Sequence, residues 1–279
     1  MSDNGPKSTH ANIQFFHVPP SPPDRYLDIL NPDGTFNRNY TTEGRPVPYI
    51  ENLRFRTPEN APTLDGEGYQ LFSNCPTKFE AFDNTEEVER DYYPESIDIV
   101  KELTGASQVI IIDHNVRRRR IGDNPYAPGQ PSRRVHVDFS ASESHKILRR
   151  SLPESELAAY PERRFQILSF WRPLSHAAYD SPLVLCDYKS VNEQEDWVSL
   201  TTVRPHEEVE VVAVKYNENH KWGYYYGVTP EEVVFIKSYD SSTDKNVAFC
   251  SPHTSFDDSG TPEGSPPRES IELRLLVLY

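Results

Sequence analysis

Glycine, cysteine and long apolar runs are scarce in this 279-residue chain, and each scarcity excludes a class of protein. The 12 glycines form neither a phosphate-binding loop nor a Gly-x-Ser-x-Gly nucleophile motif. The three cysteines, Cys75, Cys186 and Cys250, are widely spaced without a Cys-x-x-Cys pair, which argues against a disulfide framework and a zinc finger. A reducing cytoplasm is therefore the expected location.

Membranes and nucleic acids are not expected partners. No apolar run is long enough to span a bilayer, and the N-terminal text MSDNGPKSTHANIQFF lacks the apolar stretch of a signal peptide. The formal charge of -14 repels phosphate backbones and anionic lipids. A small molecule is the expected partner, and the sequence leaves the oligomeric state open.

Proline and aromatic residues are abundant. The 25 prolines predict long irregular loops, while 16 tyrosines and 13 phenylalanines supply apolar surface for a core. We predict a disordered polar tail over residues 1–12 and a single domain over residues 13–279. The N-terminal extension of this domain contains short apolar pieces, VPYIENLRF and GYQLF, that suit edge strands or wrapped arms.

Two segments have helical character. Residues 85–105 begin at a capping threonine, carry acids in the first turn and end at Gly105, and Pro94 is expected to kink or split this helix. Residues 140–160 form the second candidate, in which Pro153 opens the second half.

The rest of the chain reads as short strands rich in β-branched and aromatic residues. Eight strands are predicted, over residues 108–113, 134–139, 164–171, 182–188, 209–215, 222–227, 232–239 and 271–279. Eight strands with few intervening helices favour an antiparallel sandwich or jelly roll over a doubly wound sheet. The predicted fold class is mainly β, with flanking helices and long loops.

The segment PSRRVHVDFSAS places two metal-binding side chains on one face of a predicted strand. His136 and Asp138 are two residues apart, so they project together while their apolar neighbours pack on the other side. His206 and Glu208 repeat the spacing, so the pattern alone does not separate a metal site from ordinary hydrogen-bonded histidines.

Residues near the C-terminus could complete a metal site with His136 and Asp138. His253 supplies a second imidazole, and Arg268 and Ser270, again two apart, follow it. Two imidazoles and one carboxylate bind Fe(II) on one face and leave positions open for oxygen chemistry. A guanidinium with a neighbouring hydroxyl holds a carboxylate. A dicarboxylate cosubstrate, anchored at one end and chelating iron at the other, would use the whole set.

Several longer segments of the sequence resemble the Fe(II)/2-oxoglutarate oxygenases. The resemblance is to the branch that includes fungal gibberellin desaturase, fungal natural-product hydroxylase/desaturases and the bacterial cephem methoxylase component. The resemblance covers residues 65–279. It is carried by YYPESIDIVKELTGASQVIIIDHNVRRR, RRVHVDFS, FWRPL with SPLVLCDYKS, KWGYYYGVTPEEVVFIKSYDS, and HTSF followed by PPRESIELRLL. It implies a double-stranded β-helix, which is a jelly roll.

The resemblance also implies roles for individual residues. His136, Asp138 and His253 would be the iron ligands, and Arg268, assisted by Ser270, would grip the distal carboxylate of 2-oxoglutarate. One position departs from the pattern: similar proteins usually have an asparagine two residues before the tryptophan of WRPL, where this chain has Ser169. No role of that asparagine is carried over.

Substrate contacts are predicted beside this site. Tyr126 lies in the proline-rich segment 121–134, which suits either a lid or a plain connector. Trp171 and Arg172 lie on a predicted strand and are expected to line the pocket. The arginines of segments 117–120 and 133–134 suit a rim for an anionic substrate, although pairing with nearby acids is the favoured interpretation.

The sequence therefore predicts an oxygenase that uses Fe(II), 2-oxoglutarate and O2 to hydroxylate or desaturate a small natural product of secondary metabolism. Two alternatives stay open. One is a non-catalytic jelly-roll protein for ligand binding or for service to a partner enzyme. The other is a cupin-like metal enzyme that needs no 2-oxoglutarate.

Overall fold

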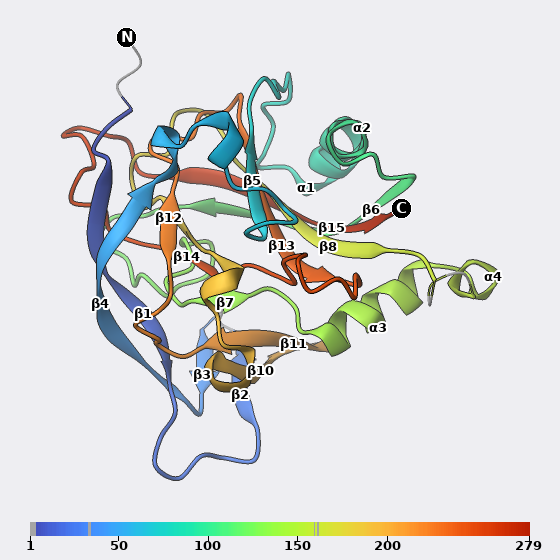
Figure 1. Cartoon of the computed structure of the whole chain (residues 1–279), viewed down its shortest axis with the longest axis horizontal. Coiled ribbons are helices and arrows are strands. Elements are labelled where there is room, and N and C mark those ends of the chain that lie inside the picture. The colour runs from blue at the N-terminus through green and yellow to red at the C-terminus, as the bar shows by residue number, and fades with distance from the viewer. Residues whose placement is uncertain (1–3, 33–34, 159, 161) are drawn as a thin grey trace.

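Two β-sheets stacked face to face form the body of the molecule, as the computed structural model in Figure 1 shows. The structure describes residues 4–32, 35–158, 160 and 162–279. The larger sheet has ten strands, in the spatial order β1 (Ser8–His17), β4 (Thr41–Asn52), β12 (Trp222–Tyr224), β9 (Leu183–Cys186), β14 (His253–Ser255), β7 (His136–Val137), β11 (Glu207–Val214), β10 (Trp197–Arg204), β2 (Tyr26–Leu30) and β3 (Phe36–Arg38). The smaller sheet has five, in the order β5 (Tyr69–Phe72), β13 (Val233–Asp240), β8 (Phe165–Pro173), β15 (Glu269–Leu278) and β6 (Gln108–Arg118).

The path of the chain between these sheets identifies the architecture. From β6 onwards the chain passes from the smaller sheet to β7, back to β8, over to β9, and later from β12 to β13, to β14 and to β15. This alternation between two facing antiparallel sheets is the path of a jelly roll. The predicted double-stranded β-helix is therefore confirmed, and all eight predicted strands are present.

One helical rod packs beside the smaller sheet (Figure 1). It consists of α1 (Thr85–Glu87), a π-helical turn (Val88–Tyr92) and α2 (Tyr93–Thr104). Proline lacks an N–H and clashes with the preceding turn, and the wider π turn directly before Pro94 accommodates it. The predicted break thus takes the form of a π turn, and Gly105 ends the rod in the left-handed conformation, with φ 72°.

The second predicted helix is divided in two. Ser140 caps α3 (Ala141–Ser151) by accepting a hydrogen bond from the backbone N–H of Glu143, and Pro153 precedes α4 (Glu154–Leu157). The remaining helices are short: α5 (Glu193–Asp196) and the 3-10 helices Leu53–Phe55, Pro58–Asn60 and Tyr188–Ser190.

Strand β15 separates two environments. Its residues Ile271 and Leu273 pack in the apolar layer against the helical rod, whereas Arg274 faces the space between the sheets, together with β11. Because side chains alternate along a strand, Ser270 and Glu272 share the inner face with Arg274. Both carry little exposed surface, so this face forms a buried polar row.

The N-terminal region is more regular than predicted. The tail predicted over residues 1–12 is too long, because β1 begins at Ser8 and pairs with β4 from there. The strand is held by the burial of Ile13 and Phe15 in an apolar cluster with other strands of the larger sheet, a context that the polar start of the chain does not reveal. Residues 1–3 lie outside the described residues.

The cysteines are free and buried. Burial raises the pKa values of Cys186 and Cys250, which disfavours thiolate nucleophiles at these positions. In the described part of the chain, no helix combines the length and apolar character needed to cross a bilayer.

Candidate metal centre

The two histidines and the aspartate of the predicted ligand set lie together between the sheets. In the antiparallel pair of β7 and β14, His136 stands directly opposite His253, with ring centroids 4.6 Å apart. Asp138 follows β7, and its Oδ1 lies 3.6 Å from His136 Nε2 while its Oδ2 lies 3.9 Å from His253 Nε2. One ligand atom from each residue falls within 4.8 Å of the others, which is the spacing of a shared metal ion.

Both imidazole rings are oriented by their other nitrogen. His136 Nδ1 lies 2.7 Å from the carbonyl oxygen of Arg134, and His253 Nδ1 lies 3.1 Å from that of Ser251. A carbonyl only accepts, so each Nδ1 carries a proton and Nε2 is the ring nitrogen that faces Asp138. Two imidazoles and a carboxylate fit Fe(II), because they coordinate one face of the ion and leave the other open.

Two serines of the smaller sheet support the carboxylate. Ser169 of β8 donates a hydrogen bond from Oγ to Asp138 Oδ2 at 2.7 Å, and Ser238 of β13 donates a longer one at 3.4 Å. The serine that departs from the family pattern therefore has a defined place: it holds the carboxylate of the ligand set. No sequence pattern marks Ser238 as a partner of the carboxylate.

The surroundings of His253 and Asp138 favour the protonation states in which these two residues bind a metal ion. Burial lowers the pKa of His253 to about 4, and the neighbouring His136 acts in the same direction, so His253 is neutral at physiological pH. Burial alone would raise the pKa of Asp138, but its side-chain contact with His136 and the positive charge of Arg274 hold this pKa well below its usual value. Asp138 is therefore ionised.

The second His-x-acid pair, His206 and Glu208, does not form a metal-binding group. His206 is exposed in the turn between β10 and β11, and Glu208 pairs with Arg25 at 2.7 Å. Among the described residues, the group with metal-ligand spacing is the one at His136.

Arg268 enters β15 with its guanidinium buried. It is 2% exposed, its Nη1 donates to the carbonyl oxygen of Ser181 at 2.6 Å, and its Nε has no partner among the described residues. The guanidinium carbon lies 5.7 Å from the ring centre of Trp171. A buried arginine with unused donors fits a carboxylate ligand. Ser270, also buried, is on the same strand in register with Arg117 of β6.

A cavity of about 570 Å³ opens beside His136 and Asp138. Its wall combines the predicted loop residue Tyr126 with residues of β2, β3, β6, β10 and β11. Six arginines contribute to it: Arg38, Arg117, Arg133, Arg134, Arg204 and Arg274. The sequence prediction missed β2, β3 and β10, and with them one side of this cavity.

Trp171 and Arg172 do not both face the interior, because they are consecutive in β8. Trp171 packs against Arg268, whereas Arg172 points to the opposite face, 5.7 Å from the ring centre of Tyr92 in the helical rod and 5.3 Å from that of Phe170. Neither belongs to the cavity wall. The prediction that Arg172 lines the pocket is therefore wrong, and Trp171 contacts the buried arginine instead.

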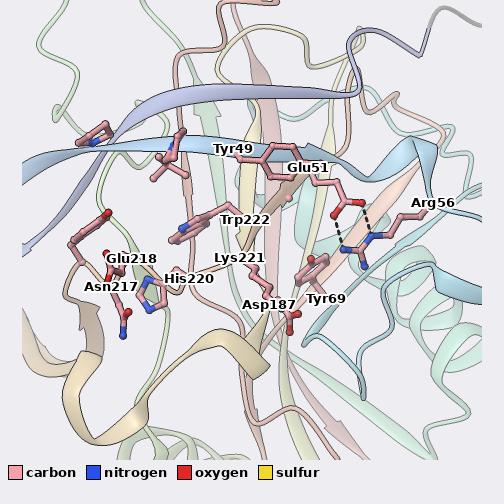
Figure 2. Close-up of a pocket in the computed structure, with 15 residues that line it drawn as sticks. Tyr49, Glu51, Arg56, Tyr69, Asp187, Asn217, Glu218, His220, Lys221 and Trp222 are labelled. Atoms are coloured by element: carbon pink, nitrogen blue, oxygen red, sulfur yellow. Dashed lines mark hydrogen bonds and ion pairs between the residues drawn. The ribbon is translucent and has the colours of Figure 1, made fainter.

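A second cavity, of about 360 Å³, is lined by residues of β4 and β12, by the segment before β12 and by Tyr69 of β5. Figure 2 shows its aromatic and polar lining, with the ion pair of Glu51 and Arg56 at one end and His220 toward the other. His220 Nε2 lies 2.9 Å from Asp196 Oδ2, so this histidine is already bound to an acid. The residues in this cavity do not have metal-ligand spacing, which leaves the His136 site as the candidate.

The comparisons with known proteins agree with this geometry. Residues 13–278 match the family described as "Oxidoreductase/YMDC permease-like domain". The chain is 32% identical over 272 residues to "Hydroxylase/desaturase efuI" of Hormonema carpetanum, covering 88% of this chain and 87% of that protein. It is 28% identical over 263 residues to "Alpha-ketoglutarate-dependent dioxygenase tstK" of Talaromyces stipitatus, covering 89% and 94% of the two chains.

The fold matches a solved structure over nearly its whole length. The "iron and alpha-ketoglutarate-dependent endoperoxidase NvfI" superposes with a TM-score of 0.80 at 24% identity, covering 98% of each chain. At this identity the likeness concerns the fold, while the 32% identity to efuI concerns the family. With the family match over residues 13–278, these findings show that the chain belongs to the Fe(II)/2-oxoglutarate-dependent dioxygenases of the fungal hydroxylase/desaturase type.

Proposed function

We propose that the chain is an Fe(II)/2-oxoglutarate-dependent oxygenase in which His136, Asp138 and His253 hold the iron. The observation that carries this proposal is the convergence of three ligand atoms, from two imidazoles and one carboxylate, within 4.8 Å. Arg268, with Ser270 beside it, holds the distal carboxylate of 2-oxoglutarate, and its unpartnered Nε supports this assignment.

The chain's own residues prepare the site for this chemistry. The carbonyls of Arg134 and Ser251 fix the imidazole rings, and Ser169 fixes the carboxylate, so little reorganisation is needed when the ion binds. Bound Fe(II) with 2-oxoglutarate activates O2 to oxidise an unactivated C–H bond, and the keto acid leaves as succinate and carbon dioxide. The burial of His253 and Asp138 between the sheets keeps bulk water from the site.

The substrate is a small natural product of secondary metabolism. The cavity of about 570 Å³ suits a small molecule, and Tyr126 on its wall is placed to contact one. Relatives are named hydroxylase/desaturases, so insertion of oxygen and removal of a second hydrogen are both within the proposed reaction class. A cytoplasmic location, and the absence of nucleic acid and membrane partners, remain predictions from the sequence.

The comparisons do not favour the alternative of a non-catalytic binding protein, because the named relatives are enzymes and the ligand set of this chain is complete. The cupin-like alternative predicts that Arg268→Ala leaves activity intact. Our proposal predicts a severe loss of affinity for 2-oxoglutarate in that variant.

The test is turnover coupled to the metal and the keto acid. Oxygen uptake and succinate formation are measured with Fe(II) and 2-oxoglutarate across a panel of fungal natural products. We expect His136→Ala to abolish oxygen uptake and succinate formation. The matched control is His206→Ala, which changes an exposed histidine outside the site and should retain both activities. Turnover that survives His136→Ala, or that does not require 2-oxoglutarate, would contradict the proposal.

A further inference from the structure

The arginines of segment 117–120 differ in their partners. Arg118 pairs with Asp83 and Glu269, Arg119 with Asp180 and Asp257, and Arg120 with Asp123. Arg117 forms no ion pair with a carboxylate in the described part of the chain. Its hydrogen bond runs from Nη1 to the carbonyl oxygen of Gln130, at 2.9 Å. One guanidinium of this basic segment therefore keeps an unmatched positive charge.

Arg117 lies close to both parts of the proposed site, the metal ligands and the binding site of the distal carboxylate. In the pairing of β6 with β15, Arg117 stands opposite Ser270, the proposed partner of Arg268. Arg117 also lines the cavity that contains His136 and Asp138, whereas Arg268 does not reach that wall. Arg117 therefore lies between the metal ligands and Arg268, the residue proposed to hold the distal carboxylate of 2-oxoglutarate.

The charge of Arg117 acts on both parts of the site. Burial lowers the pKa of Arg268 to about 9, and among the neighbouring charges the largest contribution comes from Arg117. Arg117 also contributes to the lowered pKa of His253. Two guanidinium groups therefore repel each other beside the metal ligands, and the acids that offset this repulsion at Arg268 are Glu272 and Asp180.

We propose that Arg117 is a second anchor for 2-oxoglutarate, which binds the carboxylate next to the keto group while Arg268 binds the distal one. This inference rests on the proposed function. A dianion relieves the repulsion between the two guanidinium groups and supplies acceptors for their unused donors. Arg117 is a binding and positioning residue: it sets the orientation of the keto acid relative to the three metal ligands.

The contributions of Arg117 and Arg268 can be distinguished by comparing the binding of two keto acids. 2-Oxoglutarate has both carboxylates, whereas 2-oxovalerate has only the one beside the keto group. Affinity is measured without turnover, by anaerobic titration of the Fe(II)-loaded protein and the visible charge-transfer absorption of the ferrous keto-acid chelate. Mn(II) affinity and thermal melting are measured in parallel, to verify that each variant folds and retains its metal site.

We expect Arg117→Gln to weaken the binding of both acids by about 10- to 100-fold, the usual effect of losing a charge-assisted contact. Arg268→Gln should weaken 2-oxoglutarate by a similar factor but leave 2-oxovalerate nearly unchanged. Arg117→Lys keeps the charge and should restore part of the affinity. Arg118→Gln is the matched control, because Arg118 is the neighbouring, fully paired arginine.

The outcomes distinguish this inference from the function on which it rests. If the wild type binds 2-oxoglutarate with Fe(II) and Arg117→Gln binds both acids as tightly as Arg118→Gln does, the second anchor is refuted and the oxygenase proposal stands. If Arg117→Gln weakens only 2-oxoglutarate, Arg117 acts on the distal carboxylate and the inference is also wrong. If the wild type gives no charge-transfer absorption with either acid, both proposals fail.

Discussion

Ser169 donates a hydrogen bond of 2.7 Å to Asp138, the carboxylate of the candidate metal centre, across the gap between the two sheets. The contact joins β8 of the smaller sheet to the residue after β7 in the larger one. Since the two histidines come from the larger sheet, this bond ties the ligand set to the facing sheet. The position of Asp138 therefore depends on how the two sheets pack.

Removal of this hydroxyl should weaken metal binding. In Ser169→Ala, Asp138 Oδ2 keeps only the longer bond from Ser238, so the carboxylate is less well oriented. We expect Mn(II) or Co(II) affinity, measured by competition titration, to fall by about 10-fold or more. Ser169→Asn supplies an amide donor and should retain more affinity than alanine does. Ser175→Ala, which removes a bond to Glu269 on the exposed side, should change nothing. Equal metal affinity in Ser169→Ala and the wild type would show that the carboxylate is fixed by other contacts.

Arg172 should be dispensable for the chemistry. Its guanidinium is fully buried, none of its three nitrogens has a hydrogen-bond partner among the described residues, and it packs against the rings of Tyr92 and Phe170. A buried charge without a partner costs stability, which offsets the attraction to the rings. We expect Arg172→Met to change the free energy of unfolding by less than about 1.5 kcal/mol and to leave keto-acid affinity unchanged. A large loss of affinity would place Arg172 in the site after all.

The sequence places His136 and Asp138 together because their pattern is local, whereas His253 lies far along the chain and its role is what the family resemblance implies. His136 and Asp138 are two residues apart in a strand, and strand alternation alone puts them on one face. The same rule should have excluded one of Trp171 and Arg172 from the pocket, since neighbours in a strand face opposite ways. The sequence favours pairing of the clustered arginines with nearby acids. Arg118 confirms this expectation, because it forms ion pairs with Asp83 and Glu269.

What the sequence does not reveal depends on contacts between distant segments. Ser238 reaches Asp138 from a strand 100 residues away, and no periodicity marks it. Strands β2, β3 and β10 form one side of the cavity. The β-branched run of β10, WVSLTTVR, is typical of a strand and was missed, whereas its place beside the metal ligands follows only from the pairing of distant segments. The unpaired state of Arg117 likewise follows only from where the acids lie in space, because its three following neighbours look identical in the sequence.

Lys237 should be a strong determinant of stability. It is fully buried in β13, and its Nζ donates to Asp240 at 2.6 Å, to Asp65 at 3.2 Å and to the carbonyl oxygen of Ala248 at 2.9 Å. Lys237→Met removes the cation and leaves the buried Asp240 with Arg164 as its charged partner. We expect the free energy of unfolding in urea to fall by about 3 kcal/mol.

The control for Lys237 is an exposed lysine. Lys189 pairs with Glu67 at 3.4 Å near the surface, so Lys189→Met should shift the unfolding free energy by no more than about 0.5 kcal/mol. Should the two methionine variants prove equally stable, burial of the Lys237 ion pairs contributes nothing net. A double-mutant cycle with Asp240→Asn tests the cause, because Lys237→Met should cost less in the Asp240→Asn background if the pair of Lys237 and Asp240 carries the stability.

His220 should make the stability of the protein depend on pH below neutrality. Burial lowers the pKa of His220, and the hydrogen bond to Asp196 opposes this shift only in part. The unfolded chain therefore takes up a proton near the ordinary value of 6.5 that the folded chain resists. The stabilisation is present above that pH and is lost as the pH falls, with a slope of at most about 1.4 kcal/mol per pH unit for one proton.

Urea unfolding of the wild type and of His220→Gln at pH 7.5, 6.5 and 5.5 measures this slope. The glutamine amide still donates to Asp196 but does not titrate, so the variant should lose less stability on acidification. His10→Gln, at an exposed position, serves as the matched control and should follow the wild-type curve. If His220→Gln is as sensitive to acid as the wild type, other groups control the acid response, and the buried histidine is protonated in the folded state as readily as in the unfolded one.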